Sequence, residues 1–263
     1  MIEWSHWHNE PYLVGGLVLV GWLYAILAGP FRSRLTPDEP YPIRRAIKFY
    51  ASLIIFYLAV GSPLDQIAER FLFSAHMAQH FLLMFPVPIL FLLGLPHWMV
   101  DRALGWNGLR NIGGFITHPL ICGITFVFVT SVWHAPILYE WALHDKFVHI
   151  VEHLMFFGAS LLYWWTQLSP SKVFPRKSYA TQMLFQLAVV IALTPVFAYI
   201  TFSTEILYPT YEFAPRIIAS LDPGNDQLLA GVIMKLGGML VVVGAVAVSF
   251  YRWHQSTESL DQD

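Results

Sequence analysis

Five histidines in or beside apolar runs are the residues of this sequence best suited to chemistry. His76 and His80 are four residues apart, and so are His149 and His153. On a helix this spacing places both side chains of a pair on one face, about 5–6 Å apart at Cβ. His134 ends a further apolar run. Imidazoles that point inward from neighbouring helices predict a transition-metal site.

Methionines near the histidines bear on which metal this is. Met84 follows His80 by four residues and extends the same helical face, while Met77 and Met155 lie beside the two pairs. Thioether sulfur favours Cu(I) over zinc, although methionine is also a common packing residue. Imidazole alone binds copper, zinc, iron and nickel. Copper is therefore the predicted metal, with zinc and haem iron as alternatives.

Three charged residues are predicted to have auxiliary roles. Glu152 lies three residues after His149, where its carboxylate can hydrogen-bond a ligand imidazole; direct ligation and pairing with Lys146 are alternatives. Lys235 is a basic residue well inside an apolar run. One explanation for a cation in that place is that its side chain extends towards Asp226 at the membrane surface. The other is a functional role, in which the charge repels excess metal or binds an anionic group of a partner.

The composition is that of a polytopic membrane protein. Hydrophobic residues make up 56% of the 263 residues and charged residues 12%, about half the charged fraction of an ordinary soluble domain. The net charge of −2, without a long basic run, argues against nucleic-acid binding. The single cysteine, Cys122, excludes a disulfide framework and a paired-cysteine redox motif.

The apolar runs predict an all-α fold, with one transmembrane domain over residues 1–263 that contains seven spanning helices. A membrane-spanning helix needs about 17–25 predominantly apolar residues. An open strand within lipid leaves its backbone polar groups unsatisfied, so helices are expected even where β-branched residues are frequent. The predicted spans lie near residues 12–29, 45–60, 71–93, 119–134, 147–167, 179–202 and 228–251.

Lysine and arginine residues predict the orientation of these spans. They gather after the first, third and fifth spans and in the C-terminal tail, whereas acidic residues dominate the other loops. Because positively charged loops stay in the cytoplasm, the N-terminus is predicted outside and the C-terminus in the cytoplasm. Both histidine pairs then lie in the outer halves of their spans, and His134 lies at an outer end. The long outer segment 203–227 is expected to form a lid over them.

Several short motifs occur in order along the chain. They are His76-Met-Ala-Gln-His80, Gly94-Leu-Pro96, His118-Pro119, Trp133-His134-Ala-Pro136, Glu152-His153, and Asp226-Gln227 with Gly231 and Met234. This set resembles the bacterial CtaG family of polytopic caa-type cytochrome c oxidase assembly proteins. The resemblance implies a multi-pass protein of the bacterial inner membrane that delivers copper to the buried copper centre of an oxidase. One position departs from the family pattern, because Lys235 stands where a tryptophan is usual.

The leading hypothesis is a non-enzymatic metallochaperone or assembly factor. Such a protein would bind copper through the five histidines, within the lipid bilayer, and pass it to the oxidase subunit that carries the copper centre. A haem-binding membrane cytochrome, with one histidine from each of two helices as axial ligands, is an alternative. A metal-dependent membrane oxidoreductase needs more carboxylates than Glu152 offers, and a copper permease needs a polar path through the inner halves of the spans.

Overall fold

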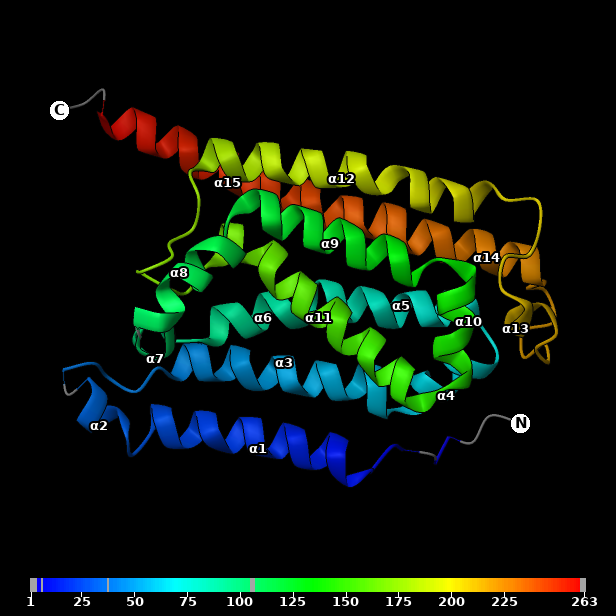
Figure 1. Cartoon of the computed structure of the whole chain (residues 1–263), viewed down its shortest axis with the longest axis horizontal. Coiled ribbons are helices and arrows are strands. Elements are labelled where there is room, and N and C mark those ends of the chain that lie inside the picture. Colours follow the sequence, from blue (N-terminus) through cyan, green and yellow to red (C-terminus); the bar gives the residue numbers. More distant parts are fainter. Residues whose placement is uncertain (1–3, 6, 37, 105–106, 261–263) are drawn as a thin grey trace.

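The chain folds as a bundle of helices. The computed structural model describes residues 4–5, 7–36, 38–104 and 107–260, and every regular element within these ranges is a helix. The long helices run back and forth along one axis, so that α1 (Pro11–Ala28) begins and α15 (Gly238–Leu260) ends at opposite ends of the bundle (Figure 1). The predicted all-α class is therefore confirmed.

Several passes along the bundle consist of two or more helices in succession. Short helices cover the turns between the passes at both ends (Figure 1). The bounds of the remaining elements are α2 (Arg32–Leu35), α3 (Ile43–Gly61), α4 (Pro63–Arg70), α5 (Phe73–Met84), α6 (Pro86–Gly94), α7 (His97–Leu104), α8 (Asn107–Ile116), α9 (Pro119–Trp133), α10 (Pro136–His144), α11 (Lys146–Leu168), α12 (Tyr179–Phe202), α13 (Pro209–Glu212), α14 (Pro223–Val232) and the π-helical turn η1 (Ile233–Gly237).

Five helical stretches in the described part of the chain are long and apolar enough to cross a membrane. Two bent helix pairs raise the number to seven if each pair is one span. These pairs are Ile43–Gly61 with Pro63–Arg70, bent by 44°, and Arg110–Ile116 with Pro119–Trp133, bent by 61°. All seven predicted spans overlap these stretches, and the predicted count of seven is the upper limit of a range of five to seven.

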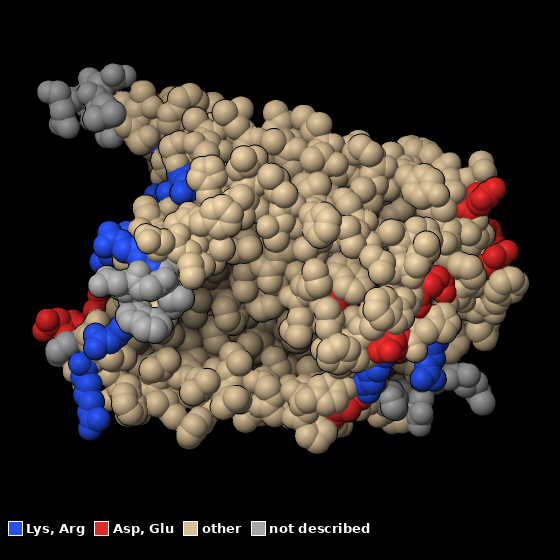
Figure 2. All heavy atoms as spheres, viewed as in Figure 1, with Lys and Arg blue, Asp and Glu red and all other residues tan. Residues whose placement is uncertain are grey.

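Charged side chains gather at the two ends of the bundle and leave an apolar surface between them (Figure 2). Leucines of separate passes are exposed on that surface, as contact with lipid requires: Leu19, Leu184 and Leu240. We call the end with α2, α7 and α8 the basic end, and the end with α4, α10 and α13 the acidic end. The basic end carries Arg32, Arg34, Arg102, Lys172 and Arg176, and the acidic end carries Glu10, Asp65, Glu69, Glu140, Asp145 and Glu205.

Proline residues begin several helices next to the histidines, since a missing N–H is tolerated in the first turn. Pro86 opens α6 directly after Phe85, so the pass that carries the first histidine pair is interrupted one turn beyond it. Pro119 opens α9, and Pro136 opens α10 shortly after α9 has ended at Trp133. The central helix α5 packs against α4, α6, α11 and α14, and most of its side chains are buried.

Candidate metal site

Helix α5 holds His76 and His80 inside the bundle, where neither side chain is exposed. The start of the helix is fixed by Asp226 of α14, whose carboxylate accepts hydrogen bonds from the backbone N–H groups of Phe73 and Ser74 at 2.8 and 3.1 Å. A carboxylate in this place accepts hydrogen bonds from N–H groups that have no partner within the helix. Its negative charge also interacts favourably with the positive end of the helix dipole. Asp226 therefore positions the helix that carries the first histidine pair.

Four buried side chains from α5 and α11 form a compact group, which we call the inner cluster: His76, His80, Glu152 and His153. Each offers one ligand atom, and the four atoms lie within 4.8 Å of one another. The Nε2 atoms of His76 and His80 are 2.9 Å apart, and Glu152 Oε1 is 3.6 Å from His80 Nε2. Four ligands about 2.0–2.1 Å from a tetrahedral ion are roughly 3.4 Å apart, so small side-chain movements give this group metal-binding geometry.

The hydroxyl group of Tyr211 determines which nitrogen of His76 carries the proton. The hydroxyl oxygen lies 2.9 Å from His76 Nδ1, and it donates its hydrogen to the carbonyl oxygen of Ala68 at 2.8 Å. Since a phenol has only one hydrogen, this oxygen accepts from the Nδ1–H of His76. Neutral His76 then presents the lone pair of Nε2 to the inner cluster, as metal-ligating histidines do.

His134 lies beside the inner cluster but is not one of its four ligands. Its ring centre is 5.7 Å from that of His80. His134 Nδ1–H donates to the carbonyl oxygen of Thr130 at 2.6 Å, which leaves the lone pair on Nε2. This buried Nε2 atom has no hydrogen-bond partner within the described ranges. His134 is therefore a candidate for a further ligand that approaches when the side chain moves.

His149 belongs to a second group with Asp65 and Glu69, which we call the outer cluster. Here too, one ligand atom from each residue lies within 4.8 Å of the others. His149 Nδ1 is 2.6 Å from Glu69 Oε1, and its Nε2 is 3.1 Å from the Nε2 of His153. The structure thus gathers the five predicted histidines in one region, but divides them between the inner cluster, the outer cluster and the separate position of His134.

Asp65 and Glu69 are absent from the predicted site because the apolar pattern ends before α4. Their spacing of four residues equals that of the two histidine pairs, and it is the signal in the sequence that points to them. The bend of 44° between α3 and α4 turns this short helix across the acidic end of the bundle, where Figure 1 shows it beside α11. Both carboxylates reach His149 from there.

Glu152 is fully buried, and neither carboxylate oxygen has a hydrogen-bond partner among the described residues. The carboxylate lies between the two clusters, with Oε1 3.6 Å from His80 Nε2 and Oε2 4.0 Å from His149 Nε2. Lys146, the alternative partner that the sequence suggests, forms an ion pair with Glu10 instead. That pairing is therefore wrong, and the carboxylate is one of the candidate ligand groups of the inner cluster.

The three methionines lie in different surroundings. Met77 and Met84 are buried in the core at 1% exposure, and Met84 also lines a small cavity next to Lys235. Met155 is 38% exposed on the surface of α11, and it is therefore apart from the buried imidazoles. The donors that the structure brings together around the histidines are nitrogen and carboxylate oxygen.

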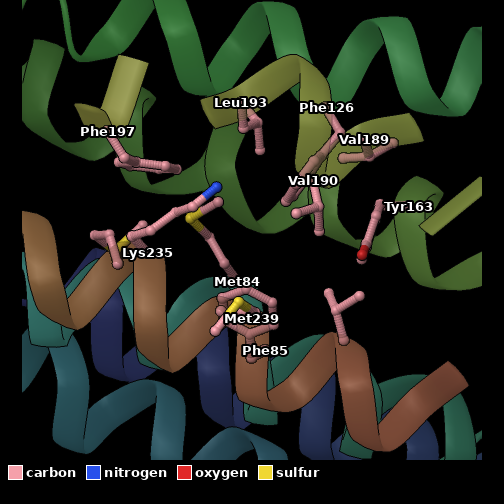
Figure 3. Close-up of a pocket in the computed structure, with 13 residues that line it drawn as sticks. Met84, Phe85, Phe126, Tyr163, Val189, Val190, Leu193, Phe197, Lys235 and Met239 are labelled. Atoms are coloured by element: carbon pink, nitrogen blue, oxygen red, sulfur yellow. The ribbon is translucent and has the colours of Figure 1, made fainter. Parts of the chain in front are cut away.

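Lys235 lies in the π-helical turn η1 and extends towards α12 across a cavity of about 40 Å³ (Figure 3). Its Nζ donates a hydrogen bond to Thr194 Oγ1 at 2.6 Å. Asp226 is engaged with the start of α5, so the expected approach of Lys235 to that carboxylate is wrong. The cavity is lined mainly by apolar side chains, and no histidine lines it.

The segment 203–227 covers the histidines through two buried tyrosines, which supports its predicted role as a lid. Tyr208 donates a hydrogen bond to the carbonyl oxygen of His134 at 2.8 Å, and Tyr211 contacts His76 as described above. The hydroxyl oxygens of Tyr139 and Tyr211 are 3.2 Å apart. The two tyrosines of the lid therefore cover His76 and His134, and Tyr211 also holds the imidazole of His76 in place.

Comparison with known proteins assigns the chain to a family. No curated protein and no solved structure matched it. Residues 22–256 match the family described as cytochrome c oxidase caa3 assembly factor (Caa3_CtaG). The matched range contains both clusters, His134, Lys235 and Asp226, and covers most of the 263 residues. The chain therefore belongs to the family of cytochrome c oxidase caa3 assembly factors.

Proposed function

We propose that this chain carries copper to a cytochrome c oxidase during the assembly of that enzyme. The copper is cargo, and the inner cluster is the place where it binds. The observation that carries this proposal is the convergence of three buried imidazoles on a carboxylate that has no other partner within the described ranges. Burial of such a group costs several kcal/mol unless its charge is compensated, and a cation provides that compensation.

The donor set favours copper among the common divalent ions. Imidazole is a good ligand for copper, zinc, iron and nickel, and Cu²⁺ has the highest affinity of these for a given site. His134 adds a lone pair on its buried Nε2 next to the cluster. A site with more candidate ligands than one ion needs allows ligands to exchange one at a time, as delivery to a partner requires.

The proposed orientation places the acidic end outside the cytoplasm and the basic end within it, following the rule that positive loops remain inside. With seven spans, the N-terminus is then outside and the C-terminus is cytoplasmic. Both clusters lie towards the acidic end of the bundle, where the lid segment 203–227 contacts His76 and His134. We expect the partner, an oxidase subunit that carries a copper centre, to approach this end within the bacterial inner membrane.

Haem is a poor candidate for the inner cluster because aromatic rings fill the space around the imidazoles. The ring centres of His80 and Phe156 are 4.4 Å apart, and those of His76 and Tyr139 are 5.0 Å apart. A metal-dependent oxidoreductase is the second candidate function, since Asp65 and Glu69 add the carboxylates that a paired-metal site needs. Turnover of an oxidisable substrate by the copper-loaded protein would favour this second function over copper delivery.

The proposal is tested by copper content. The detergent-purified protein is exposed to Cu⁺ under reducing conditions or to Cu²⁺, desalted, and analysed by element-resolved mass spectrometry. Wild type is expected to retain copper, and His80→Ala and His153→Ala are expected to lose it. His254→Ala, which removes an exposed histidine near the end of α15, is the matched control and should behave as wild type. Equal copper in all four proteins would contradict the proposed site.

A cellular measurement connects copper to the oxidase. Cells that lack this chain are complemented with wild type, His80→Ala or His254→Ala, and the copper content of the isolated oxidase is compared. Oxidase copper should be restored by wild type and by His254→Ala but not by His80→Ala. If His80→Ala restores it fully, the chain assists assembly without carrying the metal.

A further inference from the structure

The outer cluster has the features of a metal site of its own. Asp65 and Glu69 are one turn apart on α4, and His149 approaches them from α11, with one ligand atom of each within 4.8 Å of the others. His149 and Asp65 are buried, at 4% and 6% exposure. Two carboxylates and one imidazole form a donor set that binds divalent ions such as Cu²⁺ and Zn²⁺.

A cavity connects this cluster to the surface. It has a volume of about 580 Å³ and lies between α1, α3, α6 and α11. Asp65, Glu69 and His149 line it, and so does His153. His76, His80 and Glu152 do not line it and are fully buried. An ion that arrives through the cavity therefore meets the outer cluster together with His153, and it reaches the other three residues of the inner cluster only beyond them.

His149 faces both clusters with its two ring nitrogens. Nδ1 lies 2.6 Å from Glu69 Oε1, and Nε2 lies 3.1 Å from His153 Nε2 and 4.0 Å from Glu152 Oε2. The Glu152 carboxylate thus lies next to the contact between His149 and His153, and it has no hydrogen-bond partner in the described part of the chain. An ion can pass from one side of the His149 ring to the other by exchanging ligands, without returning to solvent.

We propose that Asp65, Glu69 and His149 form a second divalent-cation site, which receives the metal from the cavity and hands it through His149 to the inner cluster. This inference rests on the proposed function in that the inner cluster is taken as the destination. The transfer changes ligands only: each step breaks one metal–ligand bond and forms another, with no change of oxidation state. The competing explanation is that Glu69 and His149 form an ion pair that only stabilises the fold.

The number of ions bound per chain distinguishes these explanations. Wild type, Glu69→Gln, His80→Ala and the double variant are purified in detergent, dialysed to equilibrium against Zn²⁺ or Cu²⁺, and analysed by element-resolved mass spectrometry. Wild type is expected to bind one ion more than Glu69→Gln and one more than His80→Ala, and the double variant should bind neither. Glu205→Gln, which neutralises an exposed carboxylate at the same end of the bundle, is the control and should match wild type.

Each outcome addresses one of the two sites. If Glu69→Gln binds as many ions as wild type while His80→Ala binds fewer, the second site is refuted and the proposed function stands. If Glu69→Gln binds fewer and His80→Ala binds as many as wild type, the outer site exists and the inner one is refuted. Asp65→Asn provides a second variant of the same site in case Glu69→Gln is not monodisperse, and it should lose the same ion.

Discussion

The carboxylate of Asp226 caps the helix that begins at Phe73, although the two residues are 153 positions apart in the chain. The contact ties α14 to the start of α5 and so fixes the height of His76 and His80 within the bundle. Both hydrogen bonds are buried, and Asp226 itself has no exposed surface. A residue of the last family motif is thus directly connected to the helix that carries the first histidine pair.

The Asp226→Ala variant is expected to lose stability and copper together. Loss of a helix cap lowers the free energy of unfolding by about 0.5–2 kcal/mol. Because Asp226→Ala leaves two buried N–H groups without an acceptor, a loss near the upper value is expected. Thermal unfolding of the detergent-solubilised protein measures the loss. Asp226→Asn keeps one acceptor oxygen and should fall between Asp226→Ala and wild type. Equal unfolding temperatures of Asp226→Ala and wild type would show that the cap does not hold α5.

The sequence predicts the passes and the histidine pairs because both depend on local spacing. Runs of apolar residues identify the passes, and a spacing of four residues puts His76 beside His80 whatever the tertiary structure. The separation of His149 from His153 into a second cluster depends instead on the bend before α4. That bend is a property of tertiary packing, and it brings Asp65 to His149, 84 residues away, which no local pattern reveals.

The lysine in the last pass shows a second limit of the sequence. A cation inside an apolar run predicts an unusual environment, but several directions of the side chain satisfy that expectation. In the structure Lys235 lies in the π-helical turn η1, and it makes its contact with Thr194 of α12. Asp226, the acidic partner that the sequence offers for Lys235, is buried and occupied by a contact that only the folded bundle creates.

The Tyr211→Phe variant should weaken copper binding more than it weakens the fold. The hydroxyl group holds the Nδ1–H of His76, and its loss frees the ring to adopt the other tautomer or to rotate. Removal of such a partner of a ligand typically lowers metal affinity about 10–100-fold, whereas one lost hydrogen bond costs about 1 kcal/mol of stability. Competitive titration with a copper chelator measures the affinity.

Tyr199→Phe provides the matched control for this variant, because Tyr199 is exposed on α12. It should leave the copper affinity unchanged. An affinity of Tyr211→Phe within twofold of that of Tyr199→Phe would mean that the tyrosine hydroxyl does not orient His76.

The Lys235→Met variant should keep its copper and unfold at a higher temperature. The cavity beside Lys235 is lined mainly by apolar groups, and methionine fills a similar volume without a charge to desolvate. A lysine at the centre of a membrane helix costs about 2.5–3.5 kcal/mol, part of which the Thr194 hydrogen bond recovers. A gain of about 1 kcal/mol is therefore expected in thermal unfolding. Loss of copper from Lys235→Met would instead assign the cation a role in metal handling.

The ion pair between Glu10 and Lys146 should make stability depend on pH in the acidic range. Burial raises the pKa of Glu10, but hydrogen bonds from Lys146 and His8 outweigh it and lower the pKa from 4.5 to about 2. Since the pKa is lower in the folded protein, the contribution to stability is complete above pH 4.5 and disappears as the pH falls through about 2. Exposed ion pairs of this kind contribute about 0.2–1 kcal/mol.

Comparison of Glu10→Gln with wild type isolates this contribution. Wild type should unfold at a higher temperature at pH 7, and the difference should shrink as the pH is lowered from 4.5, because protonated Glu10 resembles the glutamine that replaces it. Glu205→Gln, a neutralised carboxylate that is exposed at the same end of the bundle, should show no such convergence. If the difference in unfolding temperature between Glu10→Gln and wild type stays constant down to pH 3, the charge of Glu10 does not stabilise the contact between the segment before α1 and α11.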